Sequence, residues 1–174
     1  GTTGTGGAGK SSLVDELVHR FLRDFPEKTL AIVSVDPTRR KSVGALLGDR
    51  LRMMTAAPDK GLFIRSLSSG IVQGGLGPHV REVVDALSGY GFDYILVETV
   101  GAGQSDFAIR DIPNNVILLL MPESGDAIQF SKAGIMEIAG CYVLNKGDLA
   151  GADATEAQLR NALADDRRPL FRIS

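Results

Sequence analysis

The sequence has a single cysteine, Cys141, so no disulfide can form within the chain. It has only two histidines, and no cysteine or histidine pair at metal-ligand spacing, which argues against a structural zinc site. It also lacks a signal peptide and any apolar run long enough to span a bilayer, since the longest, Val116–Met121, has the length of a buried strand. These absences favour a reducing compartment: the cytoplasm of a bacterium, or the mitochondrial matrix in a eukaryote.

Charge of one sign is not in excess either. The formal net charge is −2 and the isoelectric point about 5.7, so nothing global indicates binding to nucleic acid or to a membrane surface. With 174 residues, 44% of them hydrophobic and 23% charged, the composition predicts one soluble domain over residues 1–174 with a sizeable core.

Apolar runs alternate along the chain with stretches of helical periodicity. This alternation predicts an α/β three-layer sandwich with a mostly parallel central sheet, in which ligands lie beyond the carboxyl ends of the strands. The predicted strands are Leu30–Val35, Leu62–Ile64, Tyr94–Val97, Val116–Met121, Cys141–Leu144 and Leu170–Ile173. The predicted helices are Ser11–Phe25, Ala45–Met54, Pro78–Leu87, Ala127–Ala139 and Ala154–Leu163.

The stretch Gly4-x-x-x-x-Gly9-Lys10-Ser11 matches the P-loop pattern in full and places the chain among P-loop NTPases. Small residues are needed there because successive backbone N–H groups must curl around phosphate oxygens. Lys10 would bring positive charge to the β and γ phosphates, and Ser11 a hydroxyl to Mg²⁺. The predicted nucleotide-binding residues of this loop are Gly6, Gly7, Ala8, Gly9, Lys10, Ser11 and Ser12.

A P-loop normally follows a strand, and only Gly1-Thr2-Thr3 precedes this one. We therefore expect these residues to be the end of a strand, and the chain to be part of a longer protein.

A second motif, Asn145-Lys146-Gly147-Asp148, follows the predicted strand Cys141–Leu144. The Asp148 carboxylate can accept both N1–H and the exocyclic amine of guanine, which adenine cannot match. Asn145 would tie the loop down, and the stem of Lys146 would pack along the base. Placed late in a P-loop domain, the motif favours GTP over ATP.

Acidic residues stand at two further strand ends. Asp36 follows Leu30–Val35, and Glu98 follows Tyr94–Val97 in the position of a Walker B acid. Mg²⁺ takes oxygen ligands and keeps several waters, so Ser11, Asp36 and Glu98 are candidate ligands. Asp36 could equally be a turn residue before Pro37. Gly101 could present its N–H to the γ-phosphate.

Several stretches together resemble MeaB-type GTPases, the metallochaperones of adenosylcobalamin-dependent acyl-CoA mutases. The resemblance covers nearly the whole chain and is carried by Val35–Thr38, Gly44–Arg50, Phe63–Ser66, Val97–Ser105 and Lys132–Glu137. Gly6–Ser12 and Arg39-Arg40-Lys41 are more similar to the G domains of fused isobutyryl-CoA mutases. The departures, such as Glu123-Ser124-Gly125-Asp126 before the third switch segment, leave open which mutase is served.

The resemblance implies a GTPase of low intrinsic rate that gates loading and protection of a mutase's cobalamin. It implies that the chain works as a homodimer or as part of a fused protein, and that adenosylcobalamin is met only through the mutase. It adds Asp49 to the metal site, and Gln129 and Lys132 of the third switch to Lys10, Asp49 and Glu98 as catalytic residues. We also expect Ser174 to begin a loop that backs the base, which makes it a candidate nucleotide-binding residue.

Three alternatives remain open at this point. One is a nickel-insertion GTPase of the hydrogenase or urease type, although such proteins need Cys or His ligands near the site. Another is a regulatory module that binds GTP without hydrolysing it. The third is a signal-recognition-type GTPase, which shares the strand-end Asp36 but usually has Thr-Lys-x-Asp at the base.

Overall fold

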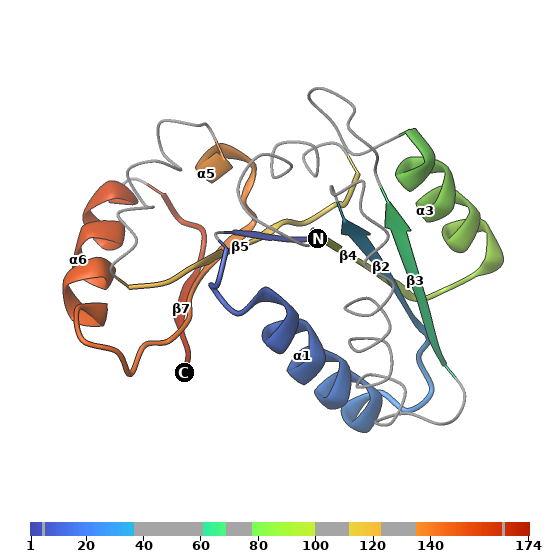
Figure 1. Cartoon of the computed structure of the whole chain (residues 1–174), viewed down its shortest axis with the longest axis horizontal. Coiled ribbons are helices and arrows are strands. Elements are labelled where there is room, and N and C mark those ends of the chain that lie inside the picture. Colours follow the sequence, from blue (N-terminus) through green and yellow to red (C-terminus); the bar gives the residue numbers. More distant parts are fainter. Residues whose placement is uncertain (5, 37–60, 69–77, 100–111, 123–134, 165) are drawn as a thin grey trace. The chain divides into compact units, whose positions relative to one another are not determined.

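The computed structural model describes residues 1–4, 6–36, 61–68, 78–99, 112–122, 135–164 and 166–174 (Figure 1). The chain divides into two compact units. One is Ser11–Gly101, and the other combines Gly1–Lys10 with Ala102–Ser174. Within each unit the β-strands pair in parallel.

The sheet of the unit Ser11–Gly101 has the strand order β3-β2-β4, with both pairings parallel. These strands are β2 (Leu30–Asp36), β3 (Leu62–Ser68) and β4 (Tyr94–Thr99). The central strand β2 is buried on both faces, since Ala31, Ile32 and Val33 are fully inaccessible. A continuous apolar run is what a strand covered on both sides requires.

Helices α1 (Lys10–Asp24) and α3 (Pro78–Tyr90) lie on opposite sides of this sheet (Figure 1). Alternate residues of β3 show why, because side chains at successive strand positions point to opposite faces. Ile64 packs in the core cluster that contains Val14 and Val18 of α1. Phe63 and Arg65 line a cavity of about 800 Å³ together with residues of α3.

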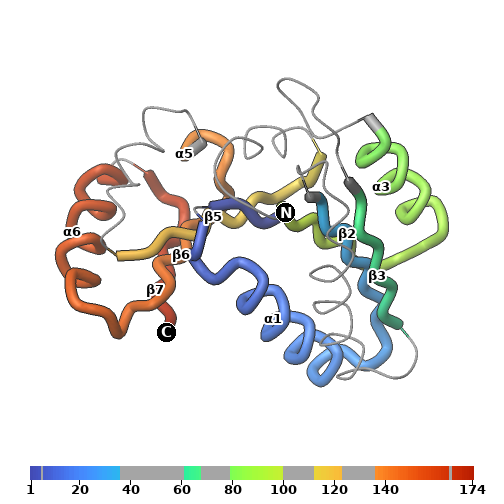
Figure 2. The backbone as a smooth tube through the Cα atoms, in the orientation of Figure 1, coloured from blue at the N-terminus to red at the C-terminus, as the bar shows by residue number. Residues whose placement is uncertain are grey.

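The other unit has the strand order β1-β5-β6-β7, again with parallel pairings (Figure 2). Its strands are β1 (Thr2–Gly4), β5 (Ile117–Leu120), β6 (Cys141–Leu144) and β7 (Leu170–Arg172). The N-terminal strand lies beside β5, with Thr3 opposite Leu118. The core of this unit contains Leu118, Tyr142 and Leu144 together with Leu159 of α6 (Ala152–Ala162), all at most 1% exposed.

The short helix α5 (Ile135–Ile138) ends against a polar cluster. The Arg168 guanidinium donates to the carbonyls of Met136 (2.8 Å), Glu137 (3.2 Å) and Ala139 (2.6 Å), which a helix end leaves without intrahelical partners. Asp166 accepts from Arg168 and lies within hydrogen-bond distance of the Tyr142 hydroxyl, so the cluster joins α5 to the segment before β7.

Most predicted elements are present, with shifted ends. The strand predicted over Leu62–Ile64 runs to Ser68, since all seven of its residues pair with β2. The helix predicted to stop before Gly89 continues to Tyr90, and Gly91, with φ 99°, follows its end. The predicted helix Ala45–Met54 and residues 127–134 lie outside the described residues. Of the helices in the described ranges, none is long and apolar enough to cross a membrane.

Candidate functional site

The predicted phosphate loop lies between β1 and α1. β1 ends at Gly4, α1 begins at Lys10, and the intervening Gly7 and Gly9 have φ values of 77° and 87°. Only glycine adopts this left-handed conformation readily. The Lys10 side chain is 7% exposed, and its ammonium donates to the Gly4 carbonyl at 2.6 Å. The helix N-terminus adds its partial positive charge next to the loop.

Asn145 joins the predicted base motif to this loop. It follows β6, and its Nδ2 donates to the carbonyl of Ala8 at 2.8 Å. The next loop residue, Gly9, packs so closely against Asn145 that a Cβ atom on Gly9 would overlap Asn145 Nδ2. The structure therefore brings together residues from the two strongest sequence motifs, which lie at opposite ends of the chain.

The rest of the base motif is held against the end of β7. The Gly147 N–H donates to the Ile173 carbonyl at 2.8 Å, and the Ile173 N–H donates to the Leu144 carbonyl at 2.9 Å. These bonds place the loop beside the segment that leads to Ser174. Lys146 has a φ of 56°, and the side chain of Asp148 is exposed to solvent.

The predicted metal-binding groups Ser11 and Glu98 meet within the unit Ser11–Gly101. Ser11 Oγ donates to Glu98 Oε1 at 2.8 Å, and Glu98 is only 2% exposed. Glu98 lies inside β4, one residue before its end, rather than after the strand as predicted, because β4 continues to pair with β2 through Thr99. Its partner in register is Ser34, two residues before Asp36 at the end of β2.

Several predicted site residues are outside the described part of the chain. These are Asp49, Gly101, Gln129 and Lys132. Asp36 is described only as the last residue of β2, so its role as a ligand remains a prediction. Within the described ranges, no group of three or more His, Cys, Asp or Glu side chains gathers in one place.

One feature of the base loop was not predicted from the sequence. Arg172, at the end of β7, donates through Nε to the Gly147 carbonyl at 3.1 Å. Nothing in the sequence distinguishes Arg172 from any exposed residue of a strand. The contact depends on the pairing of β7 with β6, which no local pattern reveals.

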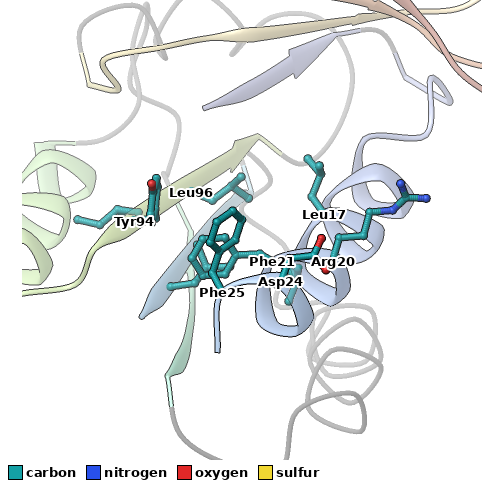
Figure 3. A pocket seen from close by; sticks show the side chains of 10 residues that line it. Leu17, Arg20, Phe21, Asp24, Phe25, Tyr94 and Leu96 are labelled. Carbon is teal, nitrogen blue, oxygen red and sulfur yellow. The ribbon is translucent and has the colours of Figure 1, made fainter. Parts of the chain in front are cut away.

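A pocket of about 300 Å³ lies between α1 and the start of β4 (Figure 3). It is lined mainly by apolar side chains, among them Leu17, Phe21, Phe25, Tyr94 and Leu96. Phe21 meets Tyr94 edge-on, with ring centroids 5.2 Å apart. The pocket adjoins the amino end of β4, opposite to the end that carries Glu98, so it is separate from the predicted metal-binding pair Ser11 and Glu98.

Comparison with known proteins is consistent with this arrangement of motifs. The protein-family model described as "Methylmalonyl Co-A mutase-associated GTPase MeaB" matches residues 1–169. A relative from Pyrococcus abyssi is 43% identical over 163 residues, which are 94% of this chain and 50% of that protein. The fused isobutyryl-CoA mutase of Geobacillus kaustophilus is 40% identical over 160 residues, 92% of this chain and 15% of the mutase. The chain thus spans about half the length of its archaeal relatives.

Among solved structures, the hydrogenase maturation factor HypB of Archaeoglobus fulgidus superposes with a TM-score of 0.69. The superposition covers 99% of this chain and 78% of HypB, at 20% sequence identity. At an identity this low, the structural similarity shows a shared fold and nothing about function. The fold is therefore that of an α/β P-loop NTPase, as predicted.

Proposed function

The chain belongs to the MeaB family of mutase-associated GTPases, and from that premise we propose that it binds and hydrolyses GTP with Mg²⁺ and gates cobalamin loading and protection of an acyl-CoA mutase. GTP would bind to the phosphate loop through its phosphates and to Asn145–Asp148 through its base. Hydrolysis would be slow in the free protein and faster on the mutase.

The hydrogen bond from Asn145 Nδ2 to the Ala8 carbonyl is the observation that carries guanine binding. It joins the phosphate loop to the motif whose Asp148 carboxylate matches the two N–H donors of guanine. Neither motif alone would support the assignment as strongly, because a glycine-rich loop indicates only phosphate and Asn-Lys-Gly-Asp alone is short.

The groups around Ser11 fit Mg²⁺. The Ser11 hydroxyl and the Glu98 carboxylate are hard oxygen donors 2.8 Å apart, and Mg²⁺ uses few protein ligands beside water and phosphate. In this arrangement the Ser11 hydroxyl donates a hydrogen bond to Glu98, so its oxygen lone pairs can coordinate the ion. The ion, when bound, offsets charge on the β and γ phosphates. Asp36 and Asp49 are proposed as further acids of this site.

The residues of this chain would act on the γ-phosphate by position and charge. Lys10 already lies folded over the loop with its ammonium on the Gly4 carbonyl, so it can move to a phosphate oxygen by exchanging one oxygen acceptor for another. Glu98 holds Ser11, and Gly101 is proposed to donate its N–H to the γ-phosphate. Gln129 and Lys132 are proposed to link the nucleotide state to the mutase.

A titration with labelled nucleotides tests the base assignment. We expect GDP and GTP to bind at least about a hundredfold more tightly than ADP and ATP, because adenine leaves the Asp148 carboxylate without its two donors. Equal affinities for guanine and adenine nucleotides would contradict the assignment.

Partner binding needs a separate experiment. The immobilised chain, loaded with GDP or with a non-hydrolysable GTP analogue, is mixed with purified methylmalonyl-CoA and isobutyryl-CoA mutases. We expect one of them to be retained in a nucleotide-dependent manner. If neither is retained in either state, the mutase role is wrong even if GTP binds. Single-turnover phosphate release, with and without mutase, then separates a GTPase from a module that only binds GTP.

A further inference from the structure

The guanidinium of Arg172 lies between the base loop and helix α6. On the loop side, Nε donates to the Gly147 carbonyl at 3.1 Å and Nη2 donates to the same oxygen. On the helix side, Nη1 donates to Asp153 at 2.5 Å and to Glu156 at 3.3 Å. The two carboxylates fix the direction of the planar donor group, so its other edge is aimed at the loop.

Gly147 is held through both its N–H and its carbonyl. Its N–H donates to the Ile173 carbonyl at 2.8 Å, and its carbonyl accepts from Arg172. The packing is close, because a Cβ at this position would lie 2.7 Å from Arg172 Cγ and 3.0 Å from the Ile173 carbonyl oxygen. The preceding residue, Lys146, has the left-handed φ of 56°, which an L-residue adopts at a cost and which surrounding contacts must therefore maintain.

We propose that Arg172 is a positioning residue that sets the preference for guanine by holding the Gly147 carbonyl. The proposal rests on the GTP-binding function above. The Gly147 carbonyl belongs to the peptide bond that leads directly into Asp148, so fixing its direction restricts the direction in which Asp148 leaves the loop. A carboxylate that accepts two parallel N–H groups needs a fixed orientation more than a single contact does. Phosphate binding at Gly6–Ser11 does not depend on this restriction.

The test compares R172Q with R160Q in the whole chain. Arg160 is a matched control because it also bonds the Glu156 carboxylate, at 2.7 Å, but from the next turn of α6 and with its side chain 62% exposed. Dissociation constants are measured for the Mg²⁺ complexes of GDP, IDP and ADP, where IDP lacks the exocyclic amine of guanine.

We expect R172Q to weaken GDP binding about tenfold, because the Gly147 carbonyl loses its charged donor, and to leave ADP binding within twofold of wild type. The preference for GDP over IDP should fall in the same variant, and R172K should restore part of it. R160Q should leave the dissociation constants for GDP, IDP and ADP unchanged. A general loss of stability would raise the dissociation constants for GDP and ADP by the same factor. The ratio of the two constants therefore reports on the positioning of Asp148.

Asp153, the exposed carboxylate that contacts Arg172, provides a second variant if R172Q folds poorly. Asp153 has a side chain 92% exposed, so D153N should fold, and it should lower the GDP-to-ADP preference about two- to fivefold, as expected for a weakened exposed ion pair. Unchanged preference in R172Q and D153N, or an equal loss in R160Q, overturns the positioning role. A wild-type chain that does not prefer GDP to ADP overturns the proposed GTP binding itself.

Discussion

Replacing Gly9 by alanine tests how the phosphate loop is held. Gly9 has a φ of 87°, where an L-residue costs about 1–2 kcal/mol. A Cβ at this position would also overlap Asn145 Nδ2. The side chain of Asn145 is short and its nitrogen is bonded to the Ala8 carbonyl, so it can give way only by breaking that bond. The lost bond adds about 1 kcal/mol, and the total cost of G9A is about 2–3 kcal/mol.

Gly7 offers a control in the same loop. Its φ of 77° imposes a similar backbone cost, but a Cβ there would have no atom within 4 Å. G7A should therefore lower the free energy of unfolding by about 1–2 kcal/mol only. Both are measured by urea unfolding of the nucleotide-free protein in EDTA, so that phosphate contacts do not contribute.

A double-mutant cycle then isolates the contact. In an N145A background the bond to Ala8 is already absent and the side chain is smaller, so G9A should cost only its backbone strain. The coupling between Gly9 and Asn145 should be about 1 kcal/mol, within the usual range for residues in contact. Equal effects of G9A and G7A, together with no coupling in the cycle, would show that Asn145 does not hold the loop as described.

Three further predictions concern other contacts. E98Q should weaken Mg²⁺-dependent GTP binding about tenfold by loosening its hold on Ser11, with GDP binding in EDTA as the unaffected control. R168M should lower the free energy of unfolding by about 2 kcal/mol, measured in urea, because it strips the end of α5 of a charged donor; a change no larger than that of R160Q would contradict this. Hydrogen bonds from the Thr29 backbone and from Lys28 lower the pKa of Asp93 to about 2. Wild type should therefore be more stable than D93N above pH of about 4, and thermal unfolding should show the difference vanishing as the pH falls through about 2.

The sequence predicted those features that depend on neighbouring residues. Continuous apolar runs located the central strands, and the glycines before Lys10 indicated the phosphate loop. The end of β4 was misplaced because Glu98 is a charged residue inside a strand, and its burial follows from pairing with β2 and from Ser11, which is far away in the sequence. The same holds for Arg172, whose partners Gly147 and Asp153 come from elements that only the folded sheet brings near.

The bond between Asn145 and Ala8 joins residues 137 positions apart. The strand that precedes the loop is also remote in sequence from its partner, since Thr3 pairs with Leu118. Contacts of this separation form late, because closing so long a stretch of chain costs entropy before any contact compensates for it. During synthesis the phosphate loop therefore emerges well before Asn145, which contacts it. We expect affinity for guanine nucleotide to appear only after β6 and Asn145 have left the ribosome, because a shorter nascent chain lacks the residue that joins the base motif to the phosphate loop.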